Sequence, residues 1–378
     1  MTATRHMIRA GALGLSLCLM PAMASAEDVK VGVVISSTGT FAFVGDPLVK
    51  GIQLAAKEME EANAFGDLNV EVVFEDNRSE KQEAITLFNR MGTADDADIV
   101  IGPVSSGEAQ ATAPVAVDLQ MPMFTTATDP GVLKAGEWVF KSTEIAEVFM
   151  GGLGKYVAET VKPEACFVVY IRDNEGYVRQ SDIFRDTIKE GGVQIAGEES
   201  ILAADSDFTA LATKMAASGA DCLFMSTPPA QGANIVIQAK QAGFPLDAVL
   251  IGNTGMTSAQ YTDTGGSAVA DTYIPADYQP DGVNEMAKAF IKNYTDTYGV
   301  TPDGWAGMGY SMFQVVANAI KNAGDSPTRD SIRAAMAATK DVPVVIGTGT
   351  FSIDEDRIPH YGTVILKWQD GAWTAPQQ

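Results

Sequence analysis

The chain has 378 residues, a length that suggests about two domains of ordinary size. Hydrophobic residues make up 46% of it and charged residues 20%, which is near the average for globular proteins and excludes collagen, coiled-coil and disordered chains. Its 48 acidic side chains against 26 basic ones give a net charge of −22, which repels phosphate backbones, so we expect no nucleic-acid partner.

Residues 1–26 have the pattern of a secretory signal peptide. Arg5 and Arg9 precede an apolar run at 10–20, and the small residues 24–26 form an A-x-A cleavage pattern. The apolar run is too short to span a bilayer, so a membrane-spanning helix is excluded. The alternative to a signal peptide is a buried N-terminal helix. We therefore predict cleavage near Ala26 and an exported, unanchored product.

From residue 29 onward, short β-rich runs alternate with helical patterns. The expected strands form two series, 29–35, 69–75, 98–102 and 122–125, then 166–171, 193–200, 221–226 and 249–252. A helix around 146–161 separates the series, and apolar residues three and four apart predict helices elsewhere, as at Ala84, Leu87, Phe88 and Met91. This alternation predicts two α/β lobes, each a doubly wound parallel sheet.

The last third of the chain departs from the alternation. A proline-bearing stretch at 274–281 precedes a helical section that runs to about 339. Strand patterns at 344–348 and 363–368 follow, around a polar turn at 354–356. We expect the late helices to cover a sheet built earlier in the chain.

The sequence offers little for catalysis or metal binding. His360 is the only histidine outside the expected signal peptide, so any Ser-His-Asp or Cys-His scheme must use it, and its segment is typical of a solvent-facing turn. Zinc-type spacing, a complete calcium loop and a phosphate-binding loop are missing. We expect no enzyme, no metal and no cofactor.

Cys166 and Cys222 each open an expected strand, and these strands could be neighbours in a parallel sheet. An exported compartment would permit a disulfide. Because the geometry for a bridge across parallel strands is poor, we favour two separate, buried, hydrophobic cysteines.

Short polar residues follow the carboxyl ends of the expected strands, where open α/β sheets bind ligands. Ser105 and Ser106 begin a helix, whose first N–H groups and dipole would cradle a carboxylate or another anion. The alternative is a capping box of Ser105 with Glu108, which would use that serine internally. Thr126 and Thr128 follow the next strand.

The second lobe has polar residues at equivalent strand ends, namely Tyr177, Thr227, Asn253 and Thr254. Two such rims that face one another form a cleft. The sequence therefore predicts that a small-molecule ligand binds between the lobes.

The chain resembles the branched-chain amino-acid (Leu/Ile/Val-binding) type of periplasmic substrate-binding protein, the soluble receptor of ABC importers. The resemblance covers essentially the whole chain after residue 26. Its marks are Val31-Gly32-Val33, Ser37-x-Gly39, Gly45-Asp46, Ile101-Gly102-Pro103 with Ser106-Gly107, Asp207-Phe208-Thr209, Ser218-Gly219-Ala220-Asp221 and Gln241-Ala242-Gly243.

This resemblance implies a type I periplasmic binding protein, in which a three-strand hinge joins two lobes that close on the ligand. It implies a first lobe of 27–143 plus 277–349 and a second lobe of 144–276 plus 350–378. It also implies a monomer in the periplasm that delivers its ligand to an ABC permease.

The resemblance also implies roles for individual residues. Ser106 and Thr128 would hold a ligand carboxylate, the Thr126 carbonyl would meet an ammonium group, and Tyr177 would close over the ligand. The implied wall residues on the first loop are Phe41 and Phe43.

One departure from the family pattern concerns the ligand. Amino-acid-binding relatives place an acid after the strand at 249–252, where this chain has Asn253 and Thr254, and Thr227 stands where a tyrosine is common. A buried ammonium without its carboxylate costs about 1–3 kcal/mol. The alternatives are an amino acid held by neutral acceptors, a carboxylate without an α-amino group, and an amide or urea-like solute. A ligand-sensing module for a membrane receptor is the alternative function.

Overall fold

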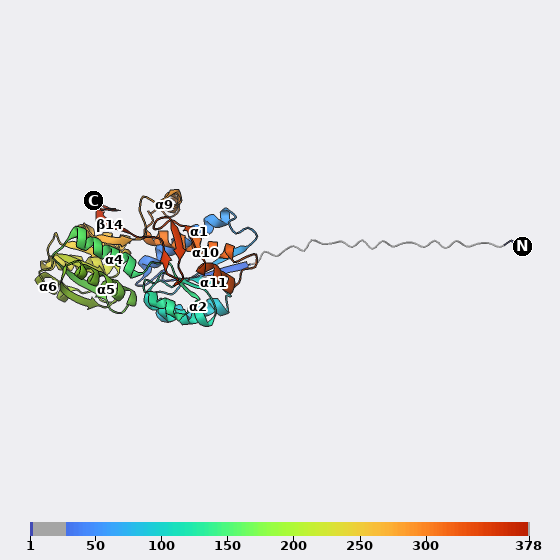
Figure 1. Cartoon of the computed structure of the whole chain (residues 1–378), viewed down its shortest axis with the longest axis horizontal. Helices are drawn as coiled ribbons and strands as arrows, with labels where there is room; N and C mark the ends of the chain where they lie inside the picture. Colours follow the sequence, from blue (N-terminus) through green and yellow to red (C-terminus); the bar gives the residue numbers. More distant parts are fainter. Residues whose placement is uncertain (3–27, 377–378) are drawn as a thin grey trace.

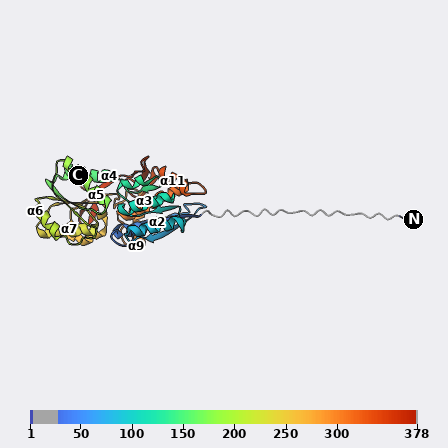
Figure 2. The same cartoon turned by 90° about the horizontal axis from the view of Figure 1, so that it is seen from below.

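The computed structural model describes residues 1–2 and 28–376. The expected signal peptide at 1–26 therefore lies almost entirely outside the described residues. Two sheets, each with helices on both faces, form two lobes that lie side by side (Figures 1 and 2). Within the described part of the chain, no helix has the length and apolar character needed to cross a membrane.

Lobe 1 is built on a parallel five-stranded sheet of order β2-β1-β3-β4-β5. Its strands are β1 (Asp28–Ile35), β2 (Asn69–Asp76), β3 (Ile99–Ile101), β4 (Met123–Thr125) and β5 (Val139–Lys141). Its helices are α1 (Ala42–Glu61), α2 (Lys81–Thr93), α3 (Ser106–Asp118), α9 (Glu285–Tyr298), α10 (Gly304–Asn322) and α11 (Arg329–Ala337), with a short helix η1 (Pro130–Ala135).

Helices α1 and α10 pack closely on one face of this sheet. A Cβ at Gly51 would lie 2.1 Å from the Ala306 carbonyl oxygen, and one at Gly309 would lie 2.1 Å from that of Leu48. Glycine at both positions therefore lets the two helix backbones touch. The opposite face of the sheet is covered by α2 and α3, which bury Phe88 and Met91.

Lobe 2 is built on a seven-stranded sheet of order β15-β14-β10-β9-β8-β6-β7, in which only the pairings that involve β14 are antiparallel. Its strands are β6 (Ala165–Ile171), β7 (Gln194–Ile201), β8 (Cys222–Ser226), β9 (Val249–Gly252), β10 (Tyr273–Ala276), β14 (Val364–Gln369) and β15 (Ala372–Thr374). Its helices are α4 (Ala146–Tyr156), continued by the π-helix η2 (Val157–Val161), α5 (Glu175–Glu190), α6 (Thr209–Ala217), α7 (Pro229–Ala242), η3 (Thr254–Thr257), α8 (Ala259–Gly265) and η4 (Gly266–Val269).

All eight expected strands of the two series are present, each within one residue of its expected ends. Three further strands of the two sheets, β5, β10 and β15, were not expected. The strand expected at 344–348 is wrong, because Gly347 and Gly349 take positive φ angles of 56° and 94° and turn the chain there. A small sheet of β11 (Val342–Pro343), β12 (Thr350–Ile353) and β13 (Pro359–His360) surrounds this turn.

The chain crosses between the lobes three times, after β5, after β10 and between β13 and β14. The third crossing lies C-terminal to the 349/350 boundary that the resemblance implies. The reason is that Phe351 and Ile353 complete the core of lobe 1, where the Phe351 ring meets Phe124 edge-on with 6.2 Å between centroids. This packing is hard to predict from the sequence, because a polar turn separates β12 from β13.

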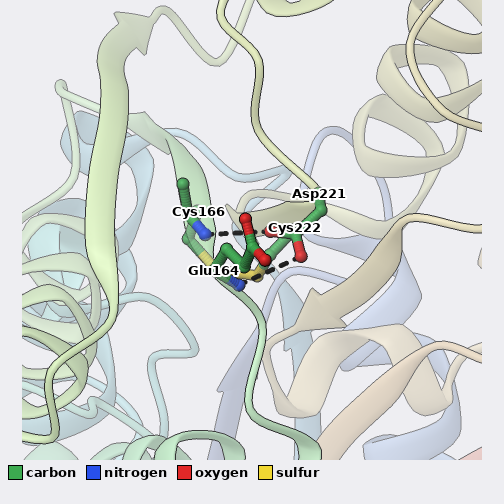
Figure 3. The surroundings of a disulfide bond; sticks show 5 residues. Glu164, Cys166, Asp221 and Cys222 are labelled. Carbon is green, nitrogen blue, oxygen red and sulfur yellow. Dashed lines mark hydrogen bonds between the residues drawn. A yellow bond between two sulfur atoms is a disulfide. The ribbon is translucent and has the colours of Figure 1, made fainter.

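Cys166 and Cys222 form a disulfide bond (Figure 3). The expectation of two separate cysteines is therefore wrong. The two residues are direct register partners on β6 and β8, with their Cα atoms 4.3 Å apart. Beside the bridge, the Asp221 carboxylate accepts the N–H groups of Glu164 at 3.0 Å and Ala165 at 2.9 Å, which ties the starts of both strands together.

Candidate functional site

A cavity of about 50 Å³ lies between the lobes, at the carboxyl ends of β3, β4 and β9 and the N-terminus of α5. It brings together eight of the nine residues that the sequence predicts for the site, and Phe41 as well. These are Phe43, Ser105, Ser106, Thr126, Thr128, Tyr177, Asn253 and Thr254. The exception is Thr227, which is buried behind the cavity with its hydroxyl directed at the Pro228 carbonyl.

The two serines at the start of α3 have different roles: the Ser105 hydroxyl caps the helix, and the Ser106 hydroxyl lies at the cavity. Ser105 is the N-cap of α3 and forms a capping box with Glu108, in which its Oγ accepts the Glu108 N–H at 3.2 Å. The alternative of a capping box is therefore correct for Ser105. Ser106 Oγ lies at the cavity wall, where it accepts the Asp129 N–H at 3.2 Å. The capping box leaves the first-turn N–H groups of Ser106 and Gly107 unused, so this helix start remains able to bind an anion.

Thr128 completes the lobe 1 side of this cradle, which we define as Ser106 and Thr128. Its Oγ1 accepts a hydrogen bond of 3.3 Å from Gln180 Nε2, which reaches across from α5 in lobe 2. Its carbonyl oxygen accepts one of 3.2 Å from Lys141 Nζ. Thr128 therefore contacts both the opposite lobe and the interior of its own.

The N-terminus of α5 lies directly over the cradle. Asn174 caps this helix by accepting the Gly176 N–H at 3.0 Å. A Cβ at Gly176 would lie 2.6 Å from both Ser106 Oγ and Thr128 Oγ1. The lobes are therefore closed on each other here, and only glycine fits at this position.

The residues after β9 offer no charge to a ligand. Asn253 Oδ1 accepts the Gly255 N–H at 2.8 Å and its Nδ2 donates to the Thr227 carbonyl at 2.9 Å, so the side chain is used within lobe 2. The Thr126 carbonyl, which the resemblance assigns to an ammonium group, accepts the Thr143 hydroxyl at 3.4 Å. Among the described residues, those that line the cavity include no Asp, Glu, Lys, Arg or His.

Aromatic and aliphatic side chains form the rest of the wall, namely Phe41, Phe43, Val44, Val104, Tyr177 and Trp305. Burial raises the pKa of the Tyr177 hydroxyl above its ordinary value, so the ring faces the cavity as a neutral phenol. Phe43 also touches lobe 2, since a Cβ at Gly255 would lie 3.0 Å from its ring. The cavity therefore combines one polar end with apolar walls.

Sequence reasoning missed Asn174, Gly176, Gln180 and Trp305. An asparagine and a glycine shortly after an expected strand were a usable signal for the first two, because that pattern is typical of a helix start. Gln180 lies inside a helix and Trp305 far along the chain, at the start of α10. Neither carries a local sign of its place at the cavity.

A metal site is not found in the part of the chain that the structure describes, where no group of three or more His, Cys, Asp or Glu side chains could hold an ion.

Comparisons with known proteins agree with this architecture. The Leu/Ile/Val-binding protein homolog 3 of Brucella melitensis is 27% identical over 93% of this chain and 94% of its own. The leucine-, isoleucine-, valine-, threonine- and alanine-binding protein of Pseudomonas aeruginosa is 24% identical over 92% of both chains.

Solved structures show the same fold. A leucine binding protein, LivK, of Thermotoga maritima has a TM-score of 0.85 and 25% identity, and the match covers 92% of this chain and 98% of that one. A solute binding protein of R. palustris in complex with benzoate has a TM-score of 0.82 and 20% identity, with 92% and 95% covered. Both belong with the two-lobed type I fold, and the model of the family described as "Periplasmic binding protein" matches residues 28–372. The chain belongs to the periplasmic binding protein family.

Proposed function

We propose that this protein is the solute-binding receptor of an ABC importer and that it captures a small carboxylate between its lobes. The observation that carries the proposal is the cradle: Ser106 and Thr128 on lobe 1 meet Gly176 and Gln180 on lobe 2 beside the cavity between the lobes. A ligand bound there touches both lobes only when they are closed, so binding favours the closed state. This is binding without catalysis, as in the relatives named as binding proteins.

We also propose that the favoured ligand lacks an α-ammonium group. An ammonium in this cavity would lie among neutral side chains, and Asn253, which follows β9, is already bonded within lobe 2. A buried charge without a partner is expensive. The aromatic walls suit a branched aliphatic or aromatic acid, and the same fold holds benzoate in the R. palustris protein.

Export and assembly complete the proposal. We propose that residues 1–26 direct the chain to the periplasm, where it acts as a monomer and docks on the importer's permease. The packing of the cores supports our proposal that lobe 1 comprises 28–143 and 277–361 and that lobe 2 comprises 144–276 and 364–376.

Two pairs of probes test the ligand class. The first pair is leucine and 4-methyl-2-oxopentanoate, in which an oxo group replaces the α-ammonium group. The second pair is benzoate and benzamide, in which a neutral amide replaces the carboxylate. Thermal unfolding of protein stripped of ligand by unfolding and refolding should show stabilisation, about 2.7 kcal/mol at 100 times Kd, by one or both acids. Stabilisation by leucine but not by its oxo analogue would contradict the proposed ligand class.

Variants test the location of the site. Ser106→Ala and Thr128→Ala should each weaken acid binding, because each removes a hydroxyl of the cradle. Ser206→Ala and Thr213→Ala, at exposed positions of lobe 2, are the matched controls and should bind as the unmodified protein does. Unchanged affinity in the two cradle variants would place the ligand elsewhere.

A further inference from the structure

Four titratable side chains meet where the three crossings between the lobes run side by side. Lys141 and Glu144 lie on the first crossing, Asp277 on the second and Tyr361 on the third. We call these four residues the hinge cluster. Lys141 is 0% exposed, and Glu144 and Tyr361 are 3% exposed each. The carboxylate oxygen Oδ1 of Asp277 is also shielded from water.

Hydrogen bonds tie the crossings to one another. Glu144 Oε1 accepts the N–H groups of Tyr361 at 3.1 Å and Gly362 at 2.9 Å, and the Glu144 N–H donates to the Tyr361 hydroxyl at 3.1 Å. Asp277 lies beside the Tyr361 side chain, whose hydroxyl favours the ionised form of the Asp277 carboxyl. The cluster is therefore part of the hinge itself, and its bonds depend on how the three crossings are arranged.

Lys141 connects this cluster to the ligand cradle. Its Nζ donates to two backbone carbonyls, that of Thr128 at 3.2 Å and that of Glu144 at 3.2 Å. Among the described residues no ion pair within 4.0 Å involves Lys141. Its ammonium is thus a buried positive charge bonded to the backbone of a cradle residue.

The charges around Lys141 leave its protonation finely balanced. Burial lowers its pKa to about 7, against the attraction of Asp129, Glu144 and Asp277, while Arg179 repels its charge. Burial and the neighbouring Glu144 raise the pKa of Asp277 to about 7, opposed by the Tyr361 hydroxyl and by Lys141. A new negative charge at the cradle would favour the protonated form of Lys141.

We propose that Lys141 is a positioning residue that couples carboxylate capture to proton uptake at the hinge, its ammonium holding the Thr128 carbonyl and supplying the positive charge that the cavity lining lacks. This inference rests on the proposed carboxylate ligand. It goes further in assigning the charge partner of that ligand to a residue that does not line the cavity.

The direction of the effect follows from linkage. A bound anion raises the pKa of Lys141, so affinity is highest when the lysine is protonated and falls as pH rises through about 7. A rise of about one unit on binding would weaken the affinity about tenfold across the transition. Asp277 gains a negative charge over the same pH range and would repel the anion, so the experiment must separate the two residues.

Calorimetric titrations from pH 5.5 to 9 at constant ionic strength test the proposal. Benzoate and 4-methyl-2-oxopentanoate are the probes, since both stay ionised over this range, and benzamide is the neutral counterpart. Buffers of different ionisation heat report the protons taken up. The variants are Lys141→Met and Asp277→Asn, and the matched control is Lys189→Met, which removes an exposed lysine.

We expect the unmodified protein to lose acid affinity about tenfold with rising pH and to take up protons on binding near neutral pH. Lys141→Met should bind the acids weakly, with an affinity that does not change with pH. In Asp277→Asn the acid affinity should still fall with rising pH, but at a lower pH, because Lys141 has lost the attraction of Asp277. Lys189→Met should behave as the unmodified protein. Benzamide binding should not follow this profile.

Three results would overturn the proposal: a flat profile in the unmodified protein, a fall that persists in Lys141→Met, or a fall that Asp277→Asn abolishes. Should Lys141→Met fail to fold, proton uptake by the unmodified protein and the Asp277→Asn profile decide between the same outcomes. Acid binding with a flat profile refutes this inference alone, whereas no binding of either acid at any pH refutes the proposed function with it.

Discussion

Gly176→Ala should disfavour closure of the lobes without weakening the lobes themselves. The added Cβ would lie 2.6 Å from Ser106 Oγ and Thr128 Oγ1, and 3.2 Å from Asn174 Oδ1. The two shorter contacts are well inside van der Waals distance, and overpacking of this kind costs about 1–3 kcal/mol. Since about 1.4 kcal/mol is a factor of ten in Kd, acid affinity should fall roughly 5- to 150-fold.

The assay measures closure and stability separately. The clash joins lobe 2 to lobe 1, so it exists only in the closed state, and thermal unfolding of the ligand-free variant should change little. Calorimetry with an acid from the probe panel gives Kd, and small-angle scattering shows whether the acid still compacts the protein. Gly152→Ala in α4 is the control, because nothing lies within 4 Å of its added Cβ. Equal acid affinity in Gly176→Ala and Gly152→Ala would refute the reasoning.

Four further predictions concern other parts of the molecule. Thr254→Glu should restore a partner for an ammonium and shift the leucine to 4-methyl-2-oxopentanoate affinity ratio toward leucine, about tenfold, in parallel titrations; an unchanged ratio would mean that the ligand's ammonium does not reach this residue. Replacing both Cys166 and Cys222 by serine opens a loop with a sequence separation of 56 and should cost about 2–4 kcal/mol in urea unfolding, and reductant should no longer affect the variant. Phe184→Ala empties a fully buried, stacked position in lobe 2 and should cost about 3–5 kcal/mol, and a loss below about 1 kcal/mol would contradict that packing. Because the raised pKa of Asp277, about 7, favours its protonated form in the folded state, its contribution to stability is lost as pH rises from about 4 to 7; Asp277→Asn should flatten this part of the stability profile, and an unchanged slope would rule it out.

Eight strands of the two sheets could be predicted from the sequence, because each is a short apolar run bounded by turn residues. The sequence did not reveal β10, whose Pro275 argues against a strand although the segment pairs with β14 at a position where the sheet turns antiparallel. It could not decide the disulfide either. That bond depends on a register in which Cys166 and Cys222 face each other, and the register is set by the packing of the whole sheet.

Most residues of the site could be predicted because they follow the carboxyl ends of strands, which the topology of a parallel sheet places together. The chemistry of each residue was harder to foresee. Ser105 and Asn253 lie at the cavity, yet the Ser105 side chain bonds within its own turn, and the Asn253 side chain bonds to Gly255 and to the Thr227 carbonyl within lobe 2. The charge that we assign to ligand binding belongs to Lys141, which lies on the edge strand β5 and reaches the cradle only through the Thr128 carbonyl.

The three crossings also set the order in which the protein can fold. Most of lobe 2 comes from one continuous stretch, 144–276, whereas α1 of lobe 1 must wait for α10 to cover it. The Tyr310 hydroxyl, for example, bonds to Glu58 at 2.5 Å across 252 positions of sequence. Contacts so distant are slow to form, so a chain emerging N-terminus first would hold the apolar face of its first sheet uncovered until its last third arrives. During that interval the uncovered apolar face favours aggregation of the growing chain.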